Sequence, residues 1–224
     1  MAIEEARGTG APGVHAALSL LEAIVARGPL TLSEIARELG VPKSTLHRVA
    51  LVLEGRGWIR REREGRYALG IRAIGIGARA SELPIVTAFR AAASGLLTRF
   101  DETICLAALD GDETVFIAIE ETSQPVRLVT GVGSRTPAFA SASGRVFLAD
   151  WRPAAVVAEF AGRSLITPTG RRLTLDDLLA SLAETSRRGF AEIDGDTAAG
   201  LWAASFPVRN GAGVVLAALT VCVP

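Results

Sequence analysis

Residues 31–70 read TLSEIARELGVPKSTLHRVALVLEGRGWIRREREGRYALG, and this stretch contains two short helical patterns that meet at a tight turn. The first pattern places four apolar residues on one helix face at the i, i+3, i+4 and i+7 spacing: Leu32, Ile35, Ala36 and Leu39. Thr31 and Glu34 have the spacing of a capping box, and Gly40 suits the left-handed residue that ends a helix. The sequence therefore predicts a helix with both ends specified.

The second pattern repeats the same spacing with Leu46, Val49, Ala50 and Leu53. Pro42 stands where this helix begins, because a missing N–H costs nothing there, and Gly55 and Gly57 mark its end. The connecting turn is so short that the two apolar faces must pack crosswise on a third element. An earlier helix, stopped by Gly28 and Pro29, supplies the partner face that we expect: Val14, Leu18, Leu21 and Val25. The arrangement is typical of a helix-turn-helix.

The opposite face of the second helix carries side chains that suit a nucleic-acid groove: Lys43, Ser44, Thr45, His47 and Arg48. Arginine can bond guanine bidentately, and lysine and hydroxyl groups can bond phosphates or base edges. The N-terminal part of a recognition helix is the part that enters the major groove. For His47, a groove contact and simple solvent exposure fit the pattern equally well.

A strand pair follows the second helix. Trp58 to Arg61 and Arg66 to Leu69 are predicted strands that flank a turn at residues 62–65. Four arginines of this wing are placed to flank a phosphate backbone: Arg60, Arg61, Arg63 and Arg66. Winged helices also serve as protein-interaction modules, but the ordered combination of these features favours binding to double-stranded DNA.

The composition limits the possible partners and compartments. The chain has 224 residues and a formal net charge of zero, so any DNA contact must come from the local basic surface and from its doubling in an oligomer. Cys105 and Cys222 lie in apolar runs without metal-ligand spacing, which fits a reducing cytoplasm. Met1 to Gly13 lacks the apolar region of a signal peptide, and no apolar run is long enough to span a membrane. We expect a cytoplasmic protein without a membrane partner.

The remainder of the chain predicts a second domain of the α+β class. Residues 1–70 form the predicted winged helix-turn-helix domain, residues 71–83 a linker helix, and residues 84–224 a domain with an antiparallel sheet and flanking helices. Helices are expected at 85–99, 143–150, 153–160 and 175–188, and strands at 103–109, 113–120, 126–129, 190–193, 202–208 and 214–221. Hairpin turns at 110–112 and 210–213 favour antiparallel pairing.

Little in the second domain indicates catalysis. Both histidines of the chain lie before residue 71, which excludes histidine-activated nucleophiles and histidine-based zinc sites from the second domain. Gly131 and Gly133 lack the third glycine of a dinucleotide fingerprint. Carboxylates remain, but side chains of this kind in hairpins and loops are usually solvated, for example Glu120, Glu121, Asp194 and Asp196. We expect neither a metal nor a cofactor, and no enzyme activity.

The order and length of these parts resemble the IclR family of bacterial transcription regulators over nearly the whole chain. In the first half the resemblance rests on residues 40–48, with Thr45 and Arg48 in place, and on residues 67–70, which close the wing. In the second half it rests on GVGSRTP at 131–137, ASASGR at 140–145, RGFA at 188–191 and Gly200 seven residues before Pro207. That half is similar to the family's effector domain, which is related to GAF domains.

The resemblance implies a homodimer or homotetramer that binds an operator and responds to a small metabolite. It implies an effector pocket lined by Leu128, Thr136, Ala142, Ser143, Ile193, Ala203, Thr220 and Cys222, with Asp194 beside it. Members that bind small acids place an acidic side chain, a cysteine and two serines where this chain has Ile193, Ala203, Thr220 and Cys222. This chain also has Arg145 in place of lysine, Asp196 in place of glutamate, and Phe206 in place of a small residue.

A pocket with so few polar partners would leave a small, highly charged acid poorly hydrogen-bonded, at a cost of several kcal/mol. We therefore expect a larger, less polar effector such as an aromatic compound. Two alternatives remain open at this stage. One is a metabolite-processing enzyme that uses a winged helix for oligomerisation or protein contacts; the other is a DNA-binding protein whose second domain only dimerises and whose pocket is vestigial.

Overall fold

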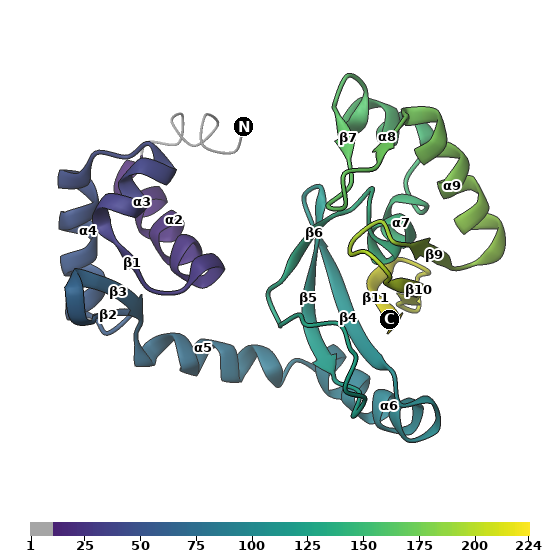
Figure 1. Ribbon diagram of the computed structural model, residues 1–224, viewed down its shortest axis with the longest axis horizontal. Coiled ribbons are helices and arrows are strands. Elements are labelled where there is room, and N and C mark those ends of the chain that lie inside the picture. The colour runs from purple at the N-terminus through teal and green to yellow at the C-terminus, as the bar shows by residue number, and fades with distance from the viewer. Residues whose placement is uncertain (1–10) are drawn as a thin grey trace. The chain divides into compact units, whose positions relative to one another are not determined.

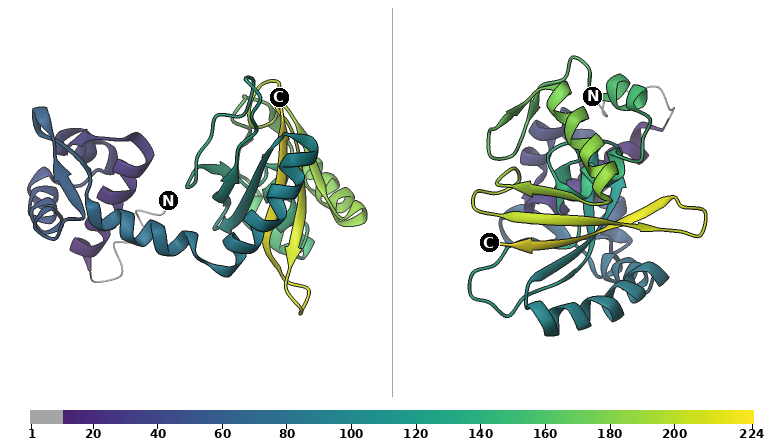
Figure 2. Two further views of the ribbon diagram at one scale, coloured as in Figure 1. Left: turned by 90° about the horizontal axis from the view of Figure 1, so that it is seen from below. Right: turned by 90° about the vertical axis from the view of Figure 1, so that its right-hand side faces the viewer.

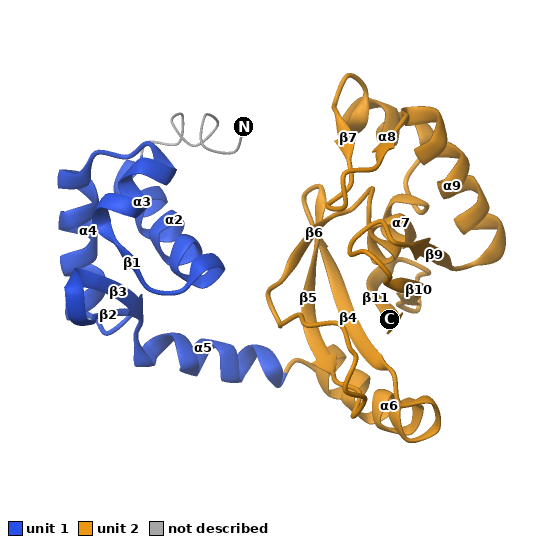
Figure 3. Cartoon of the chain, viewed as in Figure 1, with its two compact units in different colours: residues 1–82 blue, residues 83–224 orange. Residues whose placement is uncertain are grey.

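The computed structural model describes residues 11–224, and the chain divides into two compact units, residues 1–82 and 83–224 (Figures 1 and 3). The prediction for Met1 to Gly13 lies largely outside the described residues. Unit 1 (residues 1–82) comprises α2 (Pro12–Arg27), β1 (Leu30–Thr31), α3 (Leu32–Leu39), α4 (Lys43–Gly55), β2 (Ile59–Arg61), the 3-10 turn η2 (Arg63–Gly65), β3 (Arg66–Leu69) and α5 (Ile71–Ser81).

Local sequence signals specify the helix-turn-helix as predicted. The Thr31 hydroxyl accepts a hydrogen bond from the Glu34 N–H at 3.2 Å, and the Glu34 carboxylate accepts one from the Thr31 N–H at 2.7 Å. The hydrogen bond from the Thr31 backbone is the main reason that the pKa of Glu34 is lowered. Gly40 ends α3 in the left-handed conformation with φ of 63°. Leu46, Ala50 and Leu53 of α4 are buried, which leaves the opposite face of α4 in solvent.

The predicted apolar face of α2 is wrong. Val14, Leu18 and Val25 are more than half exposed, whereas the buried residues are Ala16, Leu20, Ala23 and Ile24. Apolar side chains surround most of α2, so the helical spacing alone fits more than one face. Contacts with α3, α4 and the wing select the face that is buried, and only Leu21 of the predicted set packs partly against this core.

Unit 2 (residues 83–224) is built on one antiparallel sheet with the strand order β6-β5-β4-β11-β10-β9. The strands are β4 (Thr103–Asp110), β5 (Glu113–Glu120), β6 (Arg135–Pro137), β9 (Ala191–Asp194), β10 (Trp202–Arg209) and β11 (Val215–Val223). The helices are α6 (Pro84–Phe100), α7 (Ala142–Leu148), α8 (Pro153–Phe160) and α9 (Leu175–Arg188), and a small hairpin joins β7 (Leu165–Ile166) to β8 (Arg172–Leu173). Figure 2 shows the long β10–β11 hairpin in yellow.

Alternation along the strands gives the sheet two different faces. On β4, Ile104 and Leu106 pack in the cluster that α6 covers, whereas Cys105 packs in the cluster that contains α7 and Cys222. The α7 side also carries α8 and α9 through a third cluster that contains Phe160. The sheet therefore holds one helix on one face and three on the other, which is the predicted α+β architecture.

Two predictions for unit 2 need correction. Residues 126–129 are not a strand but belong to a largely exposed loop between Pro125 and Gly131. The strand that pairs with β5 in this region is instead β6, a short edge strand that ends in Pro137. The β7–β8 hairpin was not predicted either, because two-residue strands leave no periodic signal. Among residues 11–224, no helix is both long and apolar enough to cross a membrane.

Candidate functional site

The exposed face of α4 presents most of the predicted polar residues. Lys43, Ser44, His47 and Arg48 are exposed, and Thr45 is half-buried at the first turn. The same face continues toward the end of the helix with the exposed apolar residues Leu51 and Val52, which the sequence argument missed. The first two turns of α4 thus offer a cationic and hydroxyl-bearing surface on a rigid helix.

The four wing arginines have different environments. Arg63 is exposed at the turn, and the exposed Arg61 guanidinium lies over the Tyr67 ring at 5.9 Å. Arg60 is ion-paired with Glu62. Arg66 donates to the Pro29 carbonyl at 3.0 Å and lies 3.4 Å from the Glu34 carboxylate. Arg66 therefore ties the wing to α3, while its side chain stays 40% exposed, and its contact with a phosphate stays a prediction.

Unit 2 contains a cavity of about 270 Å³ between α7 and the sheet. Eight of the nine predicted pocket residues line it: Leu128, Thr136, Ala142, Ser143, Ile193, Ala203, Thr220 and Cys222. Asp194 does not, and its predicted place in the pocket is wrong. On β9 the side chains alternate, so Ile193 is buried on the cavity face while Asp194 is exposed on the other face, opposite Trp202.

The structure adds lining residues that sequence reasoning missed: Phe116, Val129, Thr130, Ser134, Arg135, Ser141, Thr197, Ala198 and Leu201. Several of them adjoin a predicted residue along the chain. Ser134 and Arg135 lie in the same segment as Thr136, and Ser141 caps α7 just before Ala142. Phe116 and the residues of 197–201 carry no comparable signal, because their place depends on how the sheet and loops pack.

Neutral hydroxyl groups supply most of the polarity of the cavity wall. The hydroxyls of Thr114 and Ser141 lie 3.1 Å apart, and Ser143 donates to Thr114 at 3.3 Å. On the sheet side the Thr220 and Ser205 hydroxyls lie 2.9 Å apart. Thr114 and Ser205 lie behind the lining, whereas the hydroxyls of Ser141, Ser143 and Thr220 line the cavity and can each form a further hydrogen bond to a bound molecule.

Arg135 is the one charged side chain among the lining residues that the structure describes. Its guanidinium is held by the carboxylates of Glu113 and Asp110, each at 2.7 Å. The hydrogen bond to Glu113, followed by that to Asp110, raises the pKa of Arg135. Because both carboxylates already neutralise it, Arg135 does not offer the cavity an uncompensated positive charge.

A free thiol in the cavity wall has a second free thiol behind it. Cys222 lines the cavity, and Cys105 lies beside it on the neighbouring strand, buried and outside the lining. A hydrogen bond joins the two thiols; it raises the pKa of Cys105 well above its ordinary value and lowers that of Cys222. In the described part of the chain no cluster of three or more His, Cys, Asp or Glu side chains is placed to hold a metal ion.

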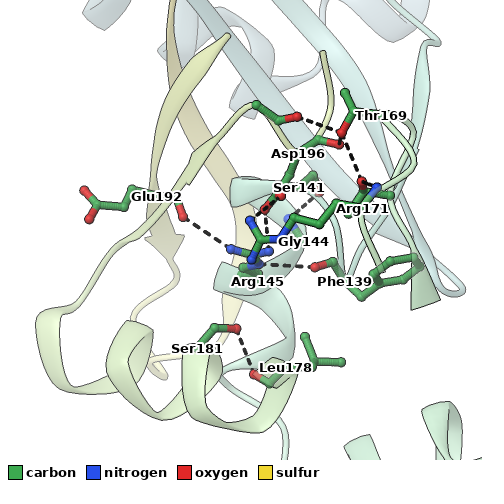
Figure 4. A network of polar contacts seen from close by, with 12 residues as sticks. Phe139, Ser141, Gly144, Arg145, Thr169, Arg171, Leu178, Ser181, Glu192 and Asp196 are labelled. Carbon is green, nitrogen blue, oxygen red and sulfur yellow. Dashed lines mark hydrogen bonds and ion pairs between the residues drawn. The ribbon is translucent and has the colours of Figure 1, made fainter. Parts of the chain in front are cut away.

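A buried ion pair stands next to the cavity (Figure 4). Asp196 is 1% exposed, and its carboxylate accepts from Arg145 at 2.8 Å and from Arg171 at 2.8 Å. Arg145 also donates to the carbonyls of Phe139 and Glu192. Burial lowers the pKa of Arg145, and the Asp196 carboxylate opposes that effect. Asp196 is thus a buried structural carboxylate, which corrects the expectation that it is solvated.

The comparisons with known proteins agree with this architecture. Residues 14–63 match the model of the IclR helix-turn-helix domain, and residues 77–224 match the model of the bacterial transcriptional regulator IclR C-terminal domain. The chain is 30% identical over 188 residues to the HTH-type transcriptional regulator KipR of Bacillus subtilis, which covers 81% of this chain and 75% of that protein. It is also 30% identical to KdgR of Escherichia coli, over 92% of this chain and 79% of the relative.

Solved structures show the same fold. An IclR transcriptional regulator from Alicyclobacillus acidocaldarius superposes with a TM-score of 0.84 at 27% identity, covering 95% of this chain and 87% of that one. An IclR homologue from Microbacterium hydrocarbonoxydans, complexed with 4-hydroxybenzoate, gives a TM-score of 0.78 at 25% identity, covering 95% and 89%. The chain belongs to the IclR family: it is a DNA-binding transcription regulator with a domain for a small-molecule effector.

Proposed function

We propose that the protein binds double-stranded operator DNA as a homodimer or homotetramer, with the first turns of α4 in the major groove. The exposure of Lys43, Ser44 and Arg48 on a helix whose opposite face is buried supports this placement. The exposed wing residues Arg61 and Arg63 then contact phosphates. A symmetric oligomer doubles this local positive surface in a chain whose net charge is zero. Because bacterial operators lie in the cytoplasm, we place the protein there.

We propose that the cavity of unit 2 binds a weakly polar metabolite about as large as a substituted aromatic ring. Binding of this metabolite changes the affinity of the protein for DNA. The observation that carries this proposal is the neutral cavity wall, in which Arg135 is already paired with two carboxylates. Apolar side chains such as Phe116, Leu128 and Ile193 can cover a ring, and the hydroxyl cluster at Ser141 can bond its polar substituent. The 4-hydroxybenzoate complex of the Microbacterium relative is consistent with this ligand class.

Titration with small acids tests the ligand class. We expect pyruvate and glyoxylate to show no micromolar binding by calorimetry, because desolvating their charge against neutral groups costs several kcal/mol. 4-Hydroxybenzoate, the aromatic probe, carries a carboxylate as well, but its ring buries apolar surface that pyruvate and glyoxylate lack and so offsets this cost. We therefore expect it to bind and to raise the melting temperature. Ala203→Leu, which places a larger side chain in the cavity, is the matched control and should abolish this stabilisation. Micromolar affinity for pyruvate or glyoxylate would contradict the proposal.

We also propose that the chain is a regulator without enzyme activity, in keeping with the transcription regulators to which it is similar. A gel shift with the DNA that flanks its own gene separates this proposal from the metabolite-processing alternative. Ligand-dependent shifts in melting temperature separate it from a protein whose second unit only dimerises.

A further inference from the structure

Residues 195–201 form a compact loop in the wall of the cavity. The ends of the loop are joined, because the Gly195 N–H donates to the Leu201 carbonyl at 2.9 Å. Three of its side chains line the cavity: Thr197, Ala198 and Leu201. The position of this loop therefore determines the shape of one side of the cavity.

The β7–β8 hairpin holds this loop from outside (Figure 4). Arg171, which directly precedes β8, donates to the Asp196 carboxylate at 2.8 Å. The Thr169 hydroxyl donates to the carbonyls of Gly195 at 2.8 Å and Asp196 at 3.2 Å. The hairpin itself is fixed because the Thr167 N–H donates to the Arg171 carbonyl and the Thr167 hydroxyl accepts from the Arg171 N–H. The base of the loop is thus attached to a surface hairpin far away in the sequence.

Arg145 and Arg171 both bind the Asp196 carboxylate, but removing one has a different structural effect from removing the other. Arg145 is a buried residue of α7, so its removal would leave the Asp196 carboxylate without its interior partner. The Arg171 side chain is 58% exposed, so its removal leaves the Arg145–Asp196 pair in place. It takes away the ion pair between the hairpin and the loop and leaves the hydrogen bonds of the Thr169 hydroxyl. Arg171 is therefore the contact that can be released without dismantling the core.

We propose that Arg171 is a positioning residue for the ligand cavity: through Asp196 it keeps the 195–201 loop, with Thr197 and Ala198, closed against the cavity. Loss of the Arg171–Asp196 contact removes one of the contacts that hold the base of this loop, so the loop opens more often and exposes the cavity to solvent during each opening. The inference rests on the proposal that the cavity is the ligand site, but its test needs no ligand.

Thiol labelling provides the test, because Cys222 lines the cavity and Cys105 does not. The full-length protein is treated with N-ethylmaleimide, and the modification of each cysteine is followed by peptide mass spectrometry. In Arg171→Ala we expect Cys222 to react about fivefold or more faster than in the wild type, because opening of the loop becomes more frequent. Cys105, which stays behind the cavity wall, should keep its rate.

Two further variants make the result specific. Arg172→Ala removes the neighbouring exposed arginine, which takes no part in the contact with Asp196. In this variant we expect Cys222 to react with N-ethylmaleimide at the wild-type rate. Arg171→Lys keeps a cation at this position, so we expect Cys222 to react with N-ethylmaleimide nearly as slowly as in the wild type. An unchanged Cys222 rate in Arg171→Ala overturns the proposal. A parallel rise at Cys105 and Cys222 also overturns it, because that pattern reports general unfolding of unit 2. Weak binding of 4-hydroxybenzoate would count against the proposed ligand class and would leave the proposed role of Arg171 unaffected.

Discussion

Gly144→Ala is expected to destabilise unit 2 by about 3 kcal/mol or more, which corresponds to a fall in melting temperature of roughly 6–12 °C. A Cβ atom at this position would lie 2.1 Å from the Ala138 carbonyl oxygen and 2.3 Å from the Ala138 Cα. These are backbone atoms, so no side-chain rotation relieves the overlap. Thermal unfolding followed by circular dichroism measures the change. Because Gly144 lets α7 approach residue 138, we also expect the variant to lose binding in the cavity lined by Ala142 and Ser143.

Gly95→Ala is the matched control for this prediction. Gly95 lies in α6 of the same unit, and a Cβ there would meet no atom within 4 Å. Alanine favours a helix over glycine by about 1 kcal/mol, so this variant should be slightly more stable than the wild type. Equal stability of Gly144→Ala and the wild type would show that α7 does not pack as closely as described.

Arg48→Ala is expected to weaken specific operator binding by about 1–3 kcal/mol, or roughly 5- to 150-fold, and to relax the base preference at one position. The reason is that an exposed arginine on the face of α4 that we place in the groove can bond guanine bidentately, and alanine cannot. Fluorescence anisotropy with a duplex from the DNA that the wild type shifts, and with single-base variants of it, measures both effects.

Arg63→Ala tests the other kind of contact. Arg63 is exposed on the wing turn, so its loss should lower the affinity evenly across sequences and flatten the salt dependence of binding. If Arg48→Ala leaves the specific affinity and the base preference unchanged, the assignment of α4 as the recognition helix is wrong.

Local signals made much of the fold predictable. Helix α8 has its predicted bounds, 153–160, because Pro153 stands at its first position. Helix α9 has its predicted bounds, 175–188, because a Thr174–Asp177 capping box begins it and Gly189 ends it in the left-handed conformation. Each of these devices acts within a few residues of the chain, so the sequence displays it directly. The face of α2 is different, because only the packing of distant elements selects it.

The candidate sites were predictable to different degrees. The family resemblance placed Ile193, Ala203 and Thr220 together, and they do line one cavity. The burial of Asp196 depends on Arg145, 51 residues away, and no local pattern records that pairing. Similarly, Arg66 hydrogen-bonds to Pro29 across 37 residues. Long-range ion pairs decide which charged residues are structural, and they appear only in the folded chain.

The central claim is that the exposed face of α4 contacts DNA, and Lys43 allows a direct measurement. Lys43 is the only lysine of the chain and is exposed at the start of α4. Acetylation of its amine by an N-hydroxysuccinimide ester is followed by mass spectrometry with and without duplex DNA. At saturating duplex we expect the rate at Lys43 to fall about fivefold or more, and to recover at high salt, where phosphate contacts are lost. An unchanged rate at Lys43 while anisotropy shows the DNA bound would contradict the account.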